Sequence, residues 1–148
     1  MAIFTSMPEQ AALLSKLGDG GRAAIVDLLV LMLFAEGDAE SHVDAFVMLL
    51  GEIPGISALS DEERGELLTR SLTKLREMPT TGLSAEITKM AQPLSSAVRP
   101  TVVALAGVVA CFGGSPGNAH KGLLDMYVTT LGVDADEVDR AMGALSLS

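Results

Sequence analysis

Cysteine is almost absent from this sequence, since Cys111 is the only one among 148 residues. A single thiol excludes an intramolecular disulfide and a metal site built from several cysteines. Cys111 lies in the apolar run 101–112, so we expect an inert thiol buried in the protein core.

Aromatic residues are also scarce. They make up 3% of the chain, with no Trp and one Tyr, whereas Met occurs eight times. β-Sheets favour aromatic and β-branched side chains, and no segment alternates apolar and polar residues as a half-buried strand does. Leu, Val, Ala and Met instead dominate the hydrophobic content of 49%. This composition favours an all-α fold.

Basic residues are few: ten Lys and Arg stand against 19 Asp and Glu, giving a formal net charge of −9. A nucleic-acid-binding surface needs clustered positive charge, so we expect no nucleic-acid partner. The apolar runs 23–35 and 101–112 have 12 to 13 residues, whereas a membrane-spanning helix needs about 20. The first fifteen residues show neither a basic start nor an apolar core segment, so we expect no signal peptide. We therefore expect a soluble cytoplasmic protein that does not insert into a membrane. Peripheral association with a membrane surface agrees with this expectation.

The apolar periodicity, with Pro and Gly at its breaks, predicts a single domain over residues 1–148 that folds as a compact bundle of about seven or eight helices. The expected helices cover 8–17, 22–35, 41–50, 60–77, 84–91, 93–112, 118–130 and 134–145. Pro100 lies inside the sixth of these, which predicts either a kink or two separate helices. Helix 22–35 is apolar on nearly all sides and should be central.

Several helix starts carry capping residues. Ser60 and Glu63 form a predicted capping box, in which each side chain accepts a hydrogen bond from the other residue's backbone N–H. Ser41 and Asp44 resemble the same box with Asp in place of Glu, and Asp134 is expected to cap the last helix. In helix 41–50 the apolar spacing predicts an inward stripe of Val43, Phe46, Val47 and Leu50.

A shift of 77 residues places 22–51 over 99–128, with Arg22 meeting Arg99 and apolar positions mostly meeting apolar positions. The agreement fits either an internal duplication or the partial match that two apolar helices give by chance. A duplication would make the fold two helical hairpins packed face to face, with flanking helices. The pseudo-repeats would then cover about residues 22–77 and 93–146.

The first hairpin would turn at a short acidic segment. Within nine positions the sequence places carboxylates at Glu36, Asp38, Glu40 and Asp44. Hard divalent cations bind several oxygen ligands from a turn, so this acidic corner predicts a weak Ca²⁺ or Mg²⁺ site. It does not match an EF-hand loop, and the lone His42 argues against zinc. The alternative is that these acids only cap a helix start and complement its dipole.

Catalysis has little support in the sequence. No G-x-S-x-G, P-loop or dinucleotide-binding motif is present. Cys111 and His120 could be imagined as a nucleophile and its base, but a thiol buried in an apolar helix is a poor nucleophile. We expect a half-buried structural role for His120, and we expect that the chain is not an enzyme.

Two segments together resemble a known family. Ala35-Glu36-Gly37-Asp38-Ala39-Glu40 follows an apolar helix, and Leu59-Ser60-Asp61-Glu62-Glu63-Arg64 begins a later one. This combination is similar to the tellurite-resistance TerB-like family, in which a helix ending in Ala-Asp-Gly precedes a Glu-bearing helix start. The resemblance covers about residues 24–145 in outline. It implies an all-helical, non-enzymatic protein that is linked to stress responses and to complexes near the membrane.

The resemblance also implies that Glu36, Asp38, Glu40 and Asp44 take the positions of the family's acidic site. Glu36 replaces the usual Asp, and the second hairpin lacks the acids. We therefore expect a non-catalytic TerB-like binding module with an unidentified protein partner and a weak divalent-cation site. The alternative is a helical adapter that docks a partner, or forms a homodimer, and binds no ion.

Overall fold

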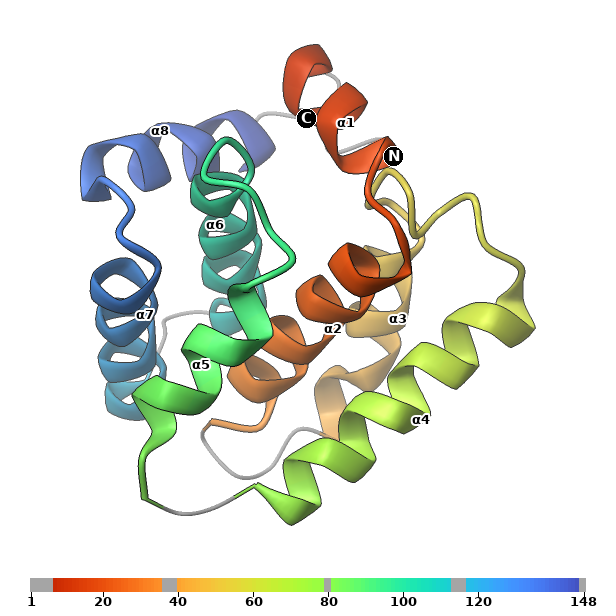
Figure 1. Ribbon diagram of the computed structural model, residues 1–148, viewed down its shortest axis with the longest axis horizontal. Helices are drawn as coiled ribbons and strands as arrows, with labels where there is room; N and C mark the ends of the chain where they lie inside the picture. The colour runs from red at the N-terminus through yellow and green to blue at the C-terminus, as the bar shows by residue number, and fades with distance from the viewer. Residues whose placement is uncertain (1–6, 36–39, 79–80, 113–116, 147–148) are drawn as a thin grey trace.

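The chain is mostly helical in the part that the structure describes. The computed structural model describes residues 7–35, 40–78, 81–112 and 117–146. Over these residues the backbone forms eight α-helices and one 3-10 helix, with no strand, which confirms the all-α prediction (Figure 1). The elements are α1 (Pro8–Ser15), α2 (Asp19–Leu33), η1 (Glu40–His42), α3 (Val43–Leu50), α4 (Asp61–Glu77), α5 (Leu83–Ala91), α6 (Arg99–Ala110), α7 (Asn118–Leu131) and α8 (Ala135–Ser146).

Two apolar helices form the centre of the molecule. α2 packs against α4, α5 and α6, while α6 packs against α2, α7 and α8 (Figure 1). Both helices are buried along most of their length, because a helix that is apolar on nearly every side is stable only when other elements surround it. This confirms the central place predicted for α2. Among the described helices, none combines the length and the apolar character that crossing a bilayer requires.

The helix α6 is shorter than the helix predicted over 93–112. It begins at Arg99, so Pro100 occupies its first turn, and residues 92–98 form no α-helix. In a first turn the missing N–H of proline breaks no hydrogen bond, because no earlier helical carbonyl is there to accept it. The proline therefore marks the helix start, and both predicted alternatives, a kinked helix through Pro100 and two separate helices within 93–112, are wrong.

Three helices begin with the same arginine contact, in which a guanidinium near the helix start donates to the carbonyl oxygen five residues earlier. The pairs are Arg22 Nη1 to Leu17 (2.8 Å), Arg64 Nη1 to Leu59 (3.1 Å) and Arg99 Nε to Leu94 (3.1 Å). Arg99 also donates to the carbonyl oxygens of Ala91 and Leu131, at the ends of α5 and α7, where helices leave acceptors unsatisfied. Arg22 and Arg99 are the residues matched by the 77-residue shift. Because Arg64, which that shift does not match, makes the same contact, the contact does not bear on the duplication, which stays a prediction.

The start of α4 is the predicted capping box. The Glu63 N–H donates to Ser60 Oγ, and the Ser60 N–H donates to the Glu63 carboxylate, each at 3.1 Å. The hydrogen bond from the Ser60 backbone lowers the pKa of the Glu63 carboxyl, and the Ser60 side chain lowers it further.

The similar box predicted for Ser41 and Asp44 is wrong. Ser41 lies inside η1, so the residue before α3 is His42, and no side chain caps that helix.

A buried tyrosine joins α7 to α2. Tyr127 is fully buried, and its hydroxyl donates to the carbonyl oxygen of Leu28 at 2.6 Å. Burial raises the pKa of the Tyr127 phenol well above its ordinary value of 10, and the negative charge of Asp27 raises it further. The folded state therefore holds this phenol in its neutral form.

We expect Tyr127, the only tyrosine of the chain, to stay protonated in the folded protein above pH 10. In the unfolded chain the phenol ionises near its ordinary pKa. The unfolded state then binds fewer protons than the folded state, so stability falls as the pH rises above about 10. In an alkaline titration, the near-ultraviolet phenolate absorbance should appear only together with loss of helical circular dichroism. A phenolate signal that rises near pH 10 at full helicity would show that Tyr127 is accessible to solvent.

Candidate functional site

The structure describes only part of the acidic corner. Glu36 and Asp38 lie outside the described residues, as does the side chain of Glu40, whose backbone belongs to η1. Asp44 is exposed in the first turn of α3. Among the side chains that the structure describes, no three His, Cys, Asp or Glu residues are grouped closely enough to hold a metal ion. The Ca²⁺ or Mg²⁺ site therefore stays a prediction.

His42, the last residue of the 3-10 helix η1 in the first predicted hairpin, contacts Phe112 of the second. The ring of His42 lies 6.3 Å from the ring of Phe112, measured between centroids, at an interplanar angle of 49°. His42 directly precedes α3, and Phe112 lies just beyond the end of α6. The residue before α3 thus contacts a residue just beyond the end of the second central helix.

The orientation of α3 differs from the predicted stripe. Phe46 and Leu50 are buried as expected, but Val43 and Val47 are 37% and 48% exposed, so their inward assignment is wrong. Leu49 is buried instead. Nearly every residue of this helix is apolar, and for such a sequence the periodicity does not determine which side faces the core.

The outer side of α3 is an exposed apolar surface. It consists of Val43, Val47 and Met48, and Met48 is 74% exposed. We call these three residues the α3 apolar face. Asp44 is exposed on the same helix, so an apolar surface and a carboxylate lie together just after the acidic corner.

Cys111 and His120, which were considered as a nucleophile and its base, have separate local environments. Cys111 is exposed at the end of α6, so the prediction of a buried core thiol is wrong. The helix ends at Ala110, one residue before the thiol, so the apolar run continues past the end of the helix. His120 is half-buried, and its Nδ1 accepts a hydrogen bond from the Gly117 N–H at 3.4 Å at the start of α7. This contact gives His120 the structural role that we predicted.

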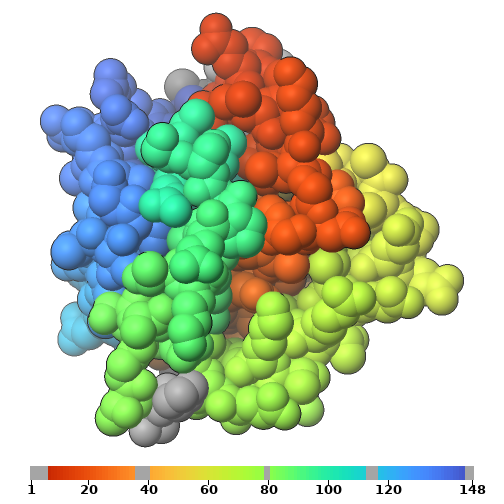
Figure 2. All heavy atoms as spheres, in the orientation of Figure 1, coloured from red at the N-terminus to blue at the C-terminus, as the bar shows by residue number. Residues whose placement is uncertain are grey.

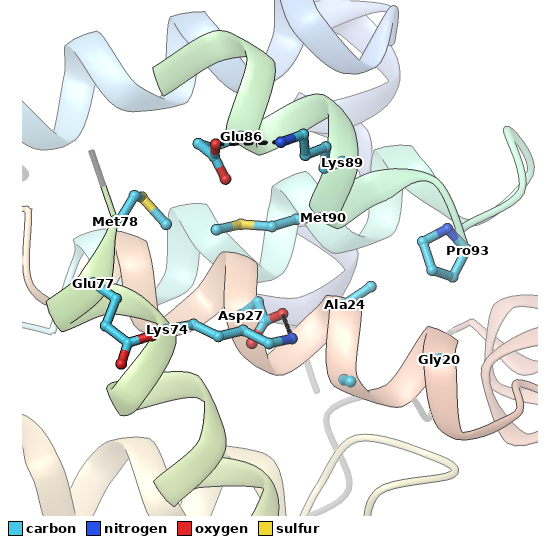
Figure 3. A pocket seen from close by; sticks show the side chains of 11 residues that line it. Gly20, Ala24, Asp27, Lys74, Glu77, Met78, Glu86, Lys89, Met90 and Pro93 are labelled. Carbon is cyan, nitrogen blue, oxygen red and sulfur yellow. Dashed lines mark hydrogen bonds and ion pairs between the residues drawn. The ribbon is translucent and has the colours of Figure 1, made fainter. Parts of the chain in front are cut away.

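A charged cavity between α2, α4 and α5 was missed by the sequence analysis (Figure 3). Asp27 lies in the middle of α2 and is only 7% exposed. Its Oδ2 accepts a hydrogen bond from Lys74 Nζ of α4 at 3.0 Å. On α5, Lys89 and Glu86 form a second ion pair at 3.6 Å. The cavity is therefore lined by one partly buried ion pair and one surface ion pair.

The cavity beside these pairs has a volume of about 460 Å³. In the space-filling view, part of α2 is visible between α4 and α5 (Figure 2). Much of the lining is uncharged and consists of Gly20, Ala23, Ala24, Met78, Met90 and Pro93. The available sequence signal was the lone Asp27 inside the apolar run 23–35. Its partner is 47 positions away, and sequence patterns do not identify such a distant pair.

Comparison with known proteins assigns no family to this chain. No family model matches it, and neither a curated protein nor a solved structure gives a match. The TerB-like resemblance therefore depends on segments 35–40 and 59–64 of the sequence, and membership of that family stays a proposal.

Proposed function

We propose that this chain is a non-catalytic, TerB-like helical binding module that acts in the cytoplasm during stress responses and docks a protein partner on α3. The observation that carries the proposal is the α3 apolar face, which is exposed beside Asp44. The opposite side of the helix is anchored in the core by Phe46. The face is therefore presented in a fixed orientation, which lowers the entropic cost of binding.

The partner that fits this surface is a basic amphipathic helix. Its apolar side chains would bury the exposed carbons of Val47 and Met48, and the flexible methionine side chain adapts to the shape of its partner. Its Lys and Arg residues would face Asp44. The net charge of −9 also attracts a basic segment from a distance. A second copy of the chain carries the same negative excess and is a less favourable occupant.

A labelled peptide with Leu and Lys arranged as an amphipathic helix tests this docking by fluorescence anisotropy. We expect saturable binding to the native chain. The Val47→Asp, Met48→Glu double variant should bind the peptide at least about tenfold more weakly, because the apolar contact is lost. Added negative charge alone would strengthen the binding of a basic peptide, so a loss identifies the apolar contact.

The matched control adds two acids elsewhere, as Thr69→Asp, Thr73→Glu on exposed positions of α4. It should bind the peptide at least as tightly as the native chain. If both double variants weaken binding equally, or if the α3 variant binds normally, the docking surface is not α3. Sedimentation at several concentrations tests the other occupant. Self-association that the α3 variant abolishes would make a second copy the partner instead.

A second candidate function is binding of Ca²⁺ or Mg²⁺ at Glu36, Asp38, Glu40 and Asp44. Asp44 favours it, because this carboxylate is exposed at the start of α3, directly after the 3-10 helix that contains Glu40. A bound cation would reduce the negative charge beside the α3 apolar face. It would then weaken the attraction of a basic partner, which would make docking sensitive to divalent cations.

Calorimetric titration with Ca²⁺, Mg²⁺ and Mn²⁺ tests this site. The binding heat should disappear in the Asp38→Ala, Glu40→Ala double variant. The control double variant Asp136→Ala, Glu137→Ala removes two exposed acids from the first turn of α8 and should keep the heat. No heat in the native chain, or equal heat in the corner variant, would leave an adapter that binds no ion.

A further inference from the structure

The buried carboxylate of Asp27 is not explained by folding alone. Its ion pair with Lys74 offsets only part of the free energy that is needed to remove a charge from water, and an apolar residue at such a position is often as stabilising. Asp27 nevertheless interrupts a central helix of apolar residues and borders a cavity of about 460 Å³. Residues that lower the stability of the fold are commonly found at binding sites.

The charges around the cavity favour a cationic ligand. The lining includes the carboxylates of Asp27, Glu77 and Glu86 and the amines of Lys74 and Lys89, three negative charges against two positive ones. The most buried of these groups is Asp27, whereas the two lysine side chains are 55% and 71% exposed. An anion that entered would meet a net negative charge, because the two amines are paired with Asp27 and Glu86 and the carboxylate of Glu77 remains. A cation would approach a negative, partly dehydrated group, where electrostatic attraction is strong.

The apolar lining sets the shape of the rest of the ligand. The side chains of Met78 and Met90 extend toward each other across the cavity (Figure 3). Methionine side chains are flexible and polarisable, and they make favourable contacts with aromatic rings and alkyl groups. The cavity volume lies in the range of about 300–1,000 Å³ that is typical of small-molecule sites. A compact apolar group joined to a cation fits both properties.

Lys74 can turn away from Asp27 when another cation takes its place. Its side chain is already 55% exposed, so its ammonium group can turn toward water. Glu77 lies three residues further along α4 and has no ion-pair partner among the described residues. This spacing on a helix permits an ion pair between the released Lys74 and Glu77. A ligand ammonium group can therefore replace the lysine.

We propose that the cavity between α2, α4 and α5 binds a small organic amine, whose ammonium group pairs with Asp27 in place of Lys74 and whose apolar body contacts Met78 and Met90. The site uses helices other than α3. The proposal therefore goes beyond the docking function and does not depend on it.

Titration of the ¹⁵N-labelled chain with three probes of similar shape tests the charge preference. Benzylammonium is positive, benzyl alcohol is neutral and benzoate is negative. We expect benzylammonium to shift the amide signals of lining residues such as Ala24, Lys74 and Met90 in a saturable manner. Benzyl alcohol should bind at least about tenfold more weakly, because it lacks the charged hydrogen bond to Asp27. Benzoate should cause no saturable shift at these positions.

Two variants distinguish a binding site from a merely structural ion pair. Lys74→Met removes the competing amine while keeping much of the side-chain stem, so it should bind benzylammonium about tenfold more tightly. Asp27→Asn keeps the shape without the charge and should lose about tenfold in affinity. Lys121→Met removes the same charge from an exposed position of α7 that does not line the cavity, and it should change nothing. If Lys74→Met does not fold, Lys74→Gln makes the same test with a smaller change in polarity.

Several results would overturn the proposal. They are absence of benzylammonium binding, binding of benzoate, equal binding of benzyl alcohol, or no gain of affinity when Lys74 is replaced. Nα-acetyl-lysine N-methylamide serves as a probe for a lysine side chain of a peptide. If it binds more tightly than benzylammonium, the ligand is a protein segment and the small-molecule assignment is wrong.

Discussion

Replacing Phe46 by Ala should lower the free energy of unfolding by about 3–5 kcal/mol. Phe46 is fully buried, and its removal would leave a cavity that the surrounding core fills only in part. α3 has eight residues, and a helix of that length is not stable in isolation. Its attachment therefore depends on the core contacts of Phe46, Leu49 and Leu50. Urea unfolding followed by circular dichroism measures the loss.

The neighbouring residue provides the control for this prediction. Val47 is 48% exposed, so Val47→Ala should change the free energy of unfolding by less than about 0.5 kcal/mol. The same variant should weaken binding of the basic amphipathic peptide. The two adjacent substitutions thus separate the side of α3 that holds the helix from the side that docks a partner. Similar destabilisation by both would mean that α3 is rotated from the orientation described above.

Replacing Gly55 by Ala should lower the free energy of unfolding by about 2–4 kcal/mol. Gly55 has φ +90°, a backbone conformation that is strained for residues with a side chain. A Cβ atom there would also lie 2.7 Å from the carbonyl oxygen of Leu14 in α1. That oxygen belongs to the backbone and cannot rotate away. The loop after α3 would therefore have to move away from α1.

A second glycine separates the effect of the positive φ angle from the effect of the steric clash. Gly132, at the end of α7, has φ +67°, but no atom beyond its own chain neighbours lies within 4 Å of the place where its Cβ would be. Gly132→Ala should cost about 1 kcal/mol, the conformational part alone. Thermal and urea unfolding of the two variants provide the comparison. An equal loss in both would indicate that the loop does not approach α1 as closely as described.

Helix positions could be predicted where their ends carry local signals. Ser60 and Glu63 identify the start of α4 by sequence spacing alone. Asp134 caps α8 as predicted, accepting a hydrogen bond from the Asp136 N–H at 2.9 Å. Pro100 indicated a break but allowed two interpretations, and the structure places it in a first turn. Such signals act over three or four residues, so a single sequence is enough to read them.

The candidate sites depend on contacts between distant residues, and these could not be predicted. The outward position of Val43 and Val47 follows from how α3 packs on the core. The contact between His42 and Phe112 joins residues that are 70 positions apart in the sequence. The partner of Asp27 is likewise on another helix. Apolar periodicity identifies residues that can be buried. It does not determine which of these residues are covered by another helix in the folded protein.

The α3 apolar face and the cavity can be tested independently, because they belong to different helices. Val47 and Met48 lie on α3, whereas Asp27 and Lys74 join α2 to α4. A substitution in the cavity should therefore leave peptide docking unchanged, and a substitution on α3 should leave amine binding unchanged. Additivity of this kind is expected for sites that share no contacts.

Oxidation of methionine by dilute hydrogen peroxide tests most directly whether α2 is buried while α3 presents an apolar face to solvent. Met32 of α2 is fully buried, whereas Met48 of α3 is 74% exposed. Met48 should form its sulfoxide at a rate close to that in the unfolded chain, while Met32 should stay protected until the protein unfolds. Peptide mass spectrometry measures both residues in one sample. If Met48 is as protected as Met32, the account of α3 as a docking surface is wrong.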